Sequence, residues 1–160
     1  MALLIELLPR TMWKAALPLG VTLSATTDLI PISSAGLAAV WIFSAAWLTL
    51  SVYGAWHYDK PIGHKLTKVN NAVTAAVGIA LIFVAVTSSA GNGPFAVEAS
   101  WLHWKIGIYG AINLMIVAML YVFDPMGIAF GRLAVEGSTP EIETTITTIM
   151  DRATVTIWLT

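Results

Sequence analysis

Three long apolar stretches constrain this chain more than any other feature of its sequence. They cover residues 34–56, 72–90 and 101–123, and they contain almost no charged residues. Each has about 20 residues, the length that an α-helix needs to cross a hydrocarbon core of about 30 Å. Apolar residues make up 58% of the 160 residues, and charged residues only 11%. The sequence therefore predicts an all-α integral membrane protein, a helical bundle with three transmembrane helices in these stretches.

Size and charge narrow the class further. The chain is short and the predicted connections are brief, so we expect a single membrane domain over residues 1–160. The net charge of -1 and the lack of basic runs argue against nucleic acid as a partner. Because the chain has no cysteine, it can form neither a disulfide nor a thiolate metal site.

The distribution of lysines predicts the orientation in the membrane. The loop 57–71 carries three lysines and no more than one acid, so the positive-inside rule predicts that it is cytoplasmic. The loop 91–100 carries an acid and no cation, and we expect it outside. Alternation of the spans returns the segment 124–151 to the cytoplasm. We therefore expect a multi-pass protein of the bacterial inner membrane. The three lysines are Lys60, Lys65 and Lys68.

The N-terminal segment is only moderately apolar. A first apolar stretch contains Glu6 and is stopped by Pro9, and a second run, 15–30, is interrupted by Pro18 and Gly20. These breaks predict a short N-terminal helix that is interfacial or tilted, followed by an outward-facing turn at 28–33.

The C-terminal segment begins with a helix-start signal. Ser138 or Thr139 comes before Pro140 and Glu141, and proline and an acid both suit the first helical turn. We expect a helix over about 140–160, with an apolar stripe on one face. No charge follows Arg152, so the helix either lies along the interface or begins a fourth span, and we favour the fourth span. The stripe consists of Ile142, Ile146, Ile149, Met150, Ala153 and Ile157.

Small residues recur at helical spacing in two of the spans. Ala72, Ala76 and Ala80 repeat every four residues, and Gly107 and Ala111 form a second pair. Small side chains let helix backbones approach closely in a membrane. We therefore predict that these residues lie at helix contacts, which serve either the packing of this bundle or the binding of another subunit.

Aromatic residues mark the ends of the spans. Trp56 and Tyr58 lie at the cytoplasmic end of the first span, and Trp101 and Trp104 at the outer end of the third, so they are predicted interface anchors. Trp41 and Trp47 lie deeper in the first span. Their indole N–H groups need acceptors, such as a helix carbonyl, a hydroxyl like that of Thr49, or a bound pigment or porphyrin.

Histidines are the conventional ligands for copper or haem that this chain offers, together with six methionines. His57 and His64 are predicted at the cytoplasmic face and His103 near the outer face, so His103 cannot share one metal with the other two. Copper and haem are the cofactors that such residues would fit, but the sequence specifies no cofactor-binding set.

Two polar residues fall within the third span. Lys105 lies near its outer end, where a cation either snorkels to the headgroups or pairs with Glu98. Asn113 lies near the middle and needs an interhelical partner, such as Thr74 or Thr87.

One segment carries a resemblance to a known family. Trp101, Leu102, His103, Trp104 and Lys105 form a W-L-x-x-K pattern, followed by an apolar span that ends in Asp124 and Pro125 and then by an acidic, threonine-rich stretch. Over about two thirds of its length the chain thus resembles the copper-resistance D-type family of small four-helix bacterial membrane proteins. The resemblance implies copper handling or haem-linked membrane chemistry. Haem-binding forms carry a histidine in the first span, and residues 34–56 contain none.

No catalytic motif is visible: the sequence shows neither a phosphate-binding loop nor a nucleophile with its base. We therefore expect a non-catalytic small subunit or accessory protein of a larger bacterial membrane complex, in electron transport or metal-dependent oxidation. Its expected partners are the lipid bilayer and other membrane subunits. Two alternatives stay open, a copper- or haem-handling membrane protein and a small oligomeric transporter.

Overall fold

The computed structural model describes residues 2–57, 60–93 and 100–158, and within them every regular element is an α-helix. The helices of this part of the chain are α1 (Ala2–Thr26), α2 (Ser34–Trp56), α3 (Pro61–Ser89), α4 (Ser100–Glu136) and α5 (Pro140–Trp158). The stretches Ser34–Trp56, Pro61–Ser89 and Ser100–Phe123 are long and apolar enough to cross a membrane. These three helices indicate a multi-pass helical membrane protein. The chain divides into two compact units, residues 1–111 and 112–160.

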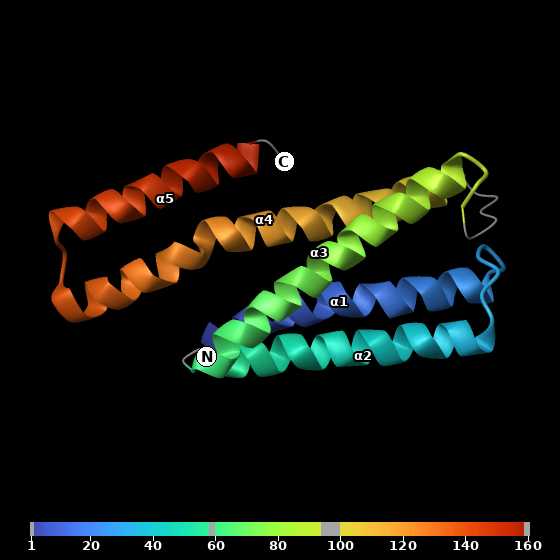
Figure 1. The fold of residues 1–160 in the computed structure, drawn as a ribbon, viewed down its shortest axis with the longest axis horizontal. Coiled ribbons are helices and arrows are strands. Elements are labelled where there is room, and N and C mark those ends of the chain that lie inside the picture. Colours follow the sequence, from blue (N-terminus) through green and yellow to red (C-terminus); the bar gives the residue numbers. More distant parts are fainter. Residues whose placement is uncertain (1, 58–59, 94–99, 159–160) are drawn as a thin grey trace. The chain divides into compact units, whose positions relative to one another are not determined.

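In the first unit, α1, α2 and α3 form a run of packed neighbours, with α1 against α2 and α2 against α3 (Figure 1). The start of α4 joins them. The Tyr109 hydroxyl donates to the Trp13 carbonyl oxygen at 2.8 Å, and the two rings stack with centroids 4.6 Å apart. A hydrogen bond and a ring contact therefore hold α4 to α1.

Helix α1 is longer than the sequence predicts. It continues through Pro9 and Pro18 to Thr26, so the prediction that Pro9 stops the first apolar stretch is wrong. Each proline removes only one N–H donor from the helical ladder, and that loss is tolerated in membrane helices. The predicted turn follows α1, and Asp28 in it adopts a left-handed φ of 55°.

Helix α2 has the predicted bounds, Ser34–Trp56. The Ser33 hydroxyl accepts the Gly36 N–H at 3.1 Å, which satisfies one of the free donors at the helix start. At the other end, the α2–α3 contact is close at Gly54, where a Cβ would lie 3.4 Å from the Leu66 Cβ.

Helices α3 and α4 both exceed the predicted spans. Helix α3 begins at Pro61, which suits the first helical turn, so the prediction of a loop up to residue 71 is wrong. Helix α4 continues through Pro125 to Glu136, although its candidate membrane span, Ser100–Phe123, ends at the predicted residue. It ends at Gly137, which has a φ of 77° and donates its N–H to the Leu133 carbonyl, as a left-handed helix cap does.

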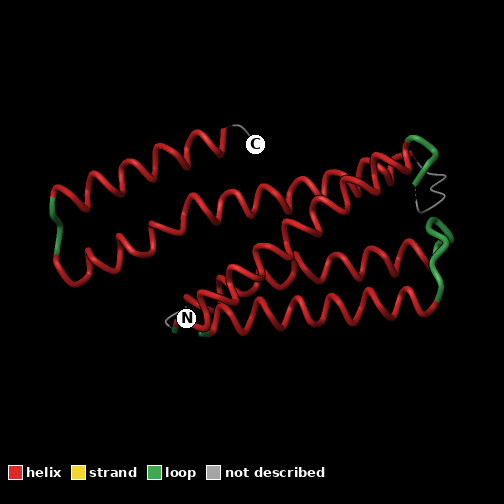
Figure 2. Tube along the Cα trace, in the orientation of Figure 1, coloured by secondary structure: helices red, strands yellow, loops and turns green. Residues whose placement is uncertain are grey.

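In the second unit, α5 returns beside the end of α4 in a helical hairpin (Figure 2). The predicted start of α5 at Pro140 is confirmed, and the Thr139 hydroxyl accepts the Ile142 N–H at 3.4 Å. Ile142, Ile149 and Ala153 of the predicted stripe are buried, whereas Met150 is half exposed, and the side chain of Ile157 lies outside the described part. Ile142, Ile149 and Ala153 thus form the buried face of α5.

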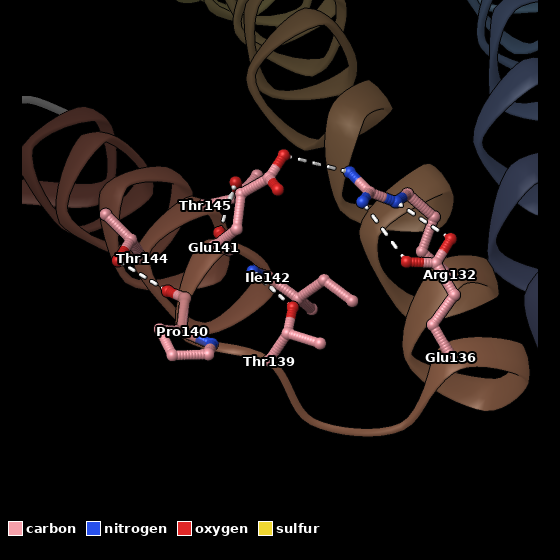
Figure 3. Close-up of polar contacts among 8 residues, drawn as sticks. All are labelled: Arg132, Glu136, Thr139, Pro140, Glu141, Ile142, Thr144 and Thr145. Carbon is pink, nitrogen blue, oxygen red and sulfur yellow. Dashed lines mark hydrogen bonds and ion pairs between the residues drawn. The ribbon is translucent and has the colours of Figure 1, made fainter.

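An exposed ion-pair cluster joins the two helices of this hairpin (Figure 3). Arg132 of α4 lies 3.2 Å from a Glu136 carboxylate oxygen on its own helix and 3.4 Å from Glu141 on α5. Hydrogen bonds to Glu136 and then to Glu141 raise the pKa of the Arg132 guanidinium. Because the cluster is exposed, it orients α5 more than it stabilises the unit.

Candidate functional site

The strongest candidate site is a layer of buried polar side chains in the first unit. Lys14 lies near the middle of α1, a helix that packs against α2. Its side chain is charged, yet the residue is only 6% exposed. Its ammonium donates to the Ser51 hydroxyl at 2.8 Å and lies 5.4 Å from the centre of the Trp47 ring. A cation–π contact of this kind contributes about 2 kcal/mol when it is desolvated. Lys14 is therefore fixed against α2 by two interactions.

The α2 residues of this layer share one helix face. Ser44, Trp47, Ser51 and Gly54 are all buried, and their spacing of three and four residues places them on the side that meets the neighbouring helices. Trp47 lies about 13 Å along the helix from Trp56 at 1.5 Å per residue, well inside the candidate span. The layer is thus within the apolar part of α2.

Helix α3 supplies the opposite side of the layer. Asn70, Asn71 and Thr74 are buried, and Thr74 donates its hydroxyl to the Asn70 carbonyl at 2.8 Å. The close contact of Gly54 with Leu66 fixes the register of the antiparallel pair α2 and α3. Moving three or four residues along each helix from that contact brings Ser51 level with Asn70.

Several buried polar atoms of the described residues have no hydrogen-bond partner. In this layer they are the Ser44 hydroxyl, the Trp47 indole Nε1 and the Asn70 side-chain oxygen. An unsatisfied buried group costs about 1–3 kcal/mol, so such atoms normally have a partner such as a bound water or another polar molecule. These three atoms make the layer the strongest candidate site of the first unit.

The predicted metal ligands are not brought together. His57 lies at the C-terminal end of α2 with Nδ1 3.0 Å from the Tyr53 carbonyl oxygen, and His64 is exposed in the first turn of α3. The Nε2 of His103 near the start of α4 is buried without a partner. No group of three or more His, Cys, Asp or Glu residues that could hold a metal occurs among the described residues.

The predicted small-residue contacts divide into two sets. A Cβ on Gly107 would lie 3.4 Å from the Ala85 Cβ of α3, so Gly107 lies at a helix contact. Ala72, Ala76, Ala80 and Ala111 are exposed, and their role in helix packing stays a prediction. On α3 the polar and glycine face is buried, and Ala72, Ala76 and Ala80 lie on the opposite face.

The two polar residues predicted within the third span differ in their exposure. Lys105 is exposed and its ammonium lies 5.5 Å from the centre of the Trp101 ring, while Glu98 lies outside the described residues. Asn113 is fully buried. The proposed partners Thr74 and Thr87 donate their hydroxyls to carbonyls of their own helix.

The aromatic anchors are exposed where the structure describes them. Trp56, Trp101 and Trp104 are 64%, 53% and 75% exposed, as side chains at a lipid interface would be, and Tyr58 lies outside the described residues. Trp41 donates its indole N–H to the Thr22 hydroxyl of α1 at 3.0 Å. Thr49 instead donates to the Ala45 carbonyl.

Sequence reasoning missed the polar layer. It assigned no buried position to Lys14, Ser44, Ser51, Asn70 or Asn71. A usable signal was present, because polar residues recur on one helix face within segments that are otherwise apolar.

No protein-family model, curated protein or solved structure matches this chain.

Proposed function

We propose that the protein is a small, non-catalytic subunit or accessory protein of a larger membrane complex. The observation that carries the proposal is the outward position of Ala72, Ala76 and Ala80 on α3. Lipid gains nothing from such a stripe, whereas a helix of another chain can approach it closely and gain dispersion contacts. Large exposed side chains lie on the same face of α3 as the alanines, and a partner helix would cover them together with the alanines. These large side chains are Val69, Ile79, Phe83 and Val86.

The proposed setting is the bacterial inner membrane. The lysines of the first turns of α3 support a cytoplasmic position for the α2–α3 connection, because positive loops stay on the cytoplasmic side. The resemblance of residues 101–105 to the copper-resistance D-type pattern favours a complex in electron transport or metal-dependent oxidation. Lipid and other membrane subunits are the proposed partners.

We also propose that α5 enters the membrane as a fourth span. Arg132 of α4 pairs with Glu141 of α5, and the two helices run antiparallel, so this pair gives their register. Ten residues further along α5 and ten residues back along α4, Asp151 lies beside about Val122. The candidate span on α4 ends at Phe123, so the charged part of α5 runs beside the portion of α4 beyond that span. The uncharged residues from Ala153 onward then begin at the membrane boundary. Helix α1 is proposed to be tilted or interfacial.

The subunit proposal is tested by placing a larger side chain among the exposed alanines of α3. Ala76→Leu should separate the protein from its partner helix, while Ala46→Leu, at an exposed alanine of α2, is the matched control. Each variant is extracted gently from native membrane, and the co-purified subunits are identified and quantified by mass spectrometry. We expect a loss of at least about tenfold in partner yield for Ala76→Leu alone, equivalent to about 1.4 kcal/mol. Equal yields for both variants would refute the proposal.

A second candidate function, a small oligomeric transporter, is favoured by the buried Lys14 and its polar layer, because charged residues inside membranes often line solute pathways. Reconstitution into liposomes distinguishes the two functions. A transporter moves a polar solute by itself, and Lys14→Met abolishes that flux. An accessory subunit gives no flux above that of empty liposomes.

A further inference from the structure

The exposed face of α3 changes from basic to apolar along the helix. Its first turns carry Lys65 and Lys68, which are both exposed. The same face continues with Val69, Ile79 and Phe83, which are 50%, 61% and 63% exposed. The buried residues of α3 lie on its opposite side. One exposed helix face therefore combines positive charge at its start with apolar surface along the rest.

Helix length places the two lysines at the depth of lipid headgroups. Residues 69–89 carry no charge, and this run of 89 − 68 = 21 residues is about 32 Å long, close to the core thickness of about 30 Å. The headgroup layer adds about 5–8 Å on each side. Lys68 directly precedes the run, and Lys65 lies about 5 Å further out. Both lysines thus fall within the headgroup layer, whereas Lys60, about 12 Å beyond Lys68, lies past it.

An aromatic residue of α2 marks the same depth independently. A Cβ on Gly54 would lie 3.4 Å from the Leu66 Cβ, so the last turn of α2 lies beside the turn of α3 that carries the lysines. Trp56 in that last turn is 64% exposed, as an indole at a lipid interface would be. The membrane boundary inferred from the charges of α3 therefore agrees with the position of an aromatic side chain on its neighbour.

The charge of the two lysines is not used within the described part of the chain. Neither Lys65 nor Lys68 has an ion pair or a side-chain hydrogen bond to another described residue. The sequence has no acid between Asp59 and Glu98, which both lie outside the described residues. The helix dipole does not account for the lysines either, because the start of a helix favours acids, and the first turn of α3 has none. Their charge is thus available to an anion from outside the chain.

The spacing of the lysines suits one phosphate group. Residues three apart on a helix are neighbours, with Cβ atoms about 5–6 Å apart, so the ammonium groups of Lys65 and Lys68 can converge on a single anion. Lysine stems lie along apolar surface while the ammonium reaches the headgroups. Hydrogen bonds from an ammonium to a phosphate oxygen are charge-assisted and stronger than neutral ones. A negatively charged headgroup with apolar chains below it therefore matches this face in both charge and polarity.

From this arrangement we propose that the exposed face of α3 binds an anionic phospholipid, such as phosphatidylglycerol, whose phosphate is held jointly by Lys65 and Lys68. The acyl chains lie against the apolar surface that begins at Val69. The proposal requires that α3 crosses a membrane, but it does not depend on a partner subunit. Lipid binding and co-purification of subunits therefore succeed or fail separately.

Lipid binding is measured by native mass spectrometry of the whole protein, which is delipidated in detergent and titrated with phosphatidylglycerol or phosphatidylcholine of the same acyl chains. A lysine near an anionic lipid surface strengthens the attraction about fivefold, so two lysines predict a preference for phosphatidylglycerol of about tenfold or more. Glycerol 3-phosphate, which has the phosphate but no acyl chains, should not displace the lipid at equal concentration.

Three substitutions of exposed lysines identify the site. Lys65→Gln and Lys68→Gln should each weaken phosphatidylglycerol binding about fivefold, and the double variant should lose the preference over phosphatidylcholine. Lys60→Gln removes the same charge from an exposed residue beyond the headgroups, so it is the matched control and should change the affinity by less than about twofold. Far-ultraviolet circular dichroism checks that each variant remains folded.

Four results would overturn the proposal. Equal affinity for the two lipids would mean that no anion is recognised, and an equal loss in Lys60→Gln and Lys65→Gln would mean that only the net charge matters. Displacement by glycerol 3-phosphate at equal concentration would assign the lysines to a free phosphate. A lower yield of co-purified subunits with Lys65→Gln, without weaker lipid binding, would show that the lysines contact an acid of a partner protein instead.

Discussion

Gly110 on α4 lies so close to α3 that even a methyl group has no room. A Cβ built there would lie 2.7 Å from the carbonyl oxygen of Gly78, 2.9 Å from the Ile82 Cγ1 and 3.1 Å from the Ile82 backbone nitrogen. Ordinary van der Waals contact begins at 3.4 Å, so relief of the closest contact requires a movement of 3.4 − 2.7 = 0.7 Å. Because the closest atom belongs to the backbone, helices rather than a side chain must move.

Gly110→Ala should therefore destabilise the first unit. Overpacking of a close contact typically costs about 1–3 kcal/mol. Replacing a helical glycine by alanine returns about 0.5–1 kcal/mol through the lower backbone entropy of the unfolded chain. The backbone clash places the cost in the upper part of its range, so we expect a net loss of about 1–2 kcal/mol.

The measurement is unfolding of the purified protein in detergent micelles, followed by tryptophan fluorescence and far-ultraviolet circular dichroism. Two alanine substitutions serve as controls. Gly107→Ala meets only an ordinary 3.4 Å contact with Ala85, and Gly20→Ala meets nothing within 4 Å. We expect Gly107→Ala to change stability by less than about 0.5 kcal/mol and Gly20→Ala to be neutral or stabilising. If Gly110→Ala were as stable as Gly107→Ala, the inferred close packing of α3 and α4 would be wrong.

Three further predictions address topology, a helix end and the metal hypothesis. Because the chain has no cysteine, single cysteines at Lys65 and Asn92 can be labelled cleanly, and the first should be accessible only from the cytoplasm and the second only from outside. Gly137→Ala should cost about 1 kcal/mol in thermal unfolding, since φ at this position is 77° and alanine disfavours it. His103→Ala should leave the bound copper, bound iron and any Soret absorption of the purified protein unchanged, and stoichiometric metal lost with this variant would instead support the cofactor hypothesis.

Helix α2 and the start of α5 were predicted well because local signals define them. Helix α2 is uncharged and mostly apolar and has a capping serine in front, and α5 starts where Thr139 precedes Pro140. The start of α3 was placed too late because its first turns are polar and basic, and the hydropathy of a span says nothing of a helix that continues into water. The same limit applies to α4, whose end beyond Pro125 is amphipathic and packs beside α5.

The buried polar layer could not be placed from hydropathy, because burial of Lys14 depends on which face of α1 meets α2. The alanines show a second limit of sequence patterns. Ala72, Ala76 and Ala80 are regularly spaced, but a stripe of small residues suits a contact within the chain and a contact with another chain equally. Spacing therefore identified a face of α3 without saying what covers it.

A physical rule separates the two faces of such a helix. Lipid is as apolar as leucine, so no hydrophobic force drives apolar side chains into the bundle, whereas polar groups lose hydrogen bonds if they face lipid. The inward face is therefore the polar one. On α3 the buried residues are asparagine, threonine, serine, glycine and alanine, and the exposed ones include valine, isoleucine and phenylalanine. Applied to α2, the rule selects Ser44 and Ser51, two helical turns apart, and these two serines bracket the tryptophan that Lys14 contacts. The polar residues of an apolar segment thus indicate both its buried face and its candidate site.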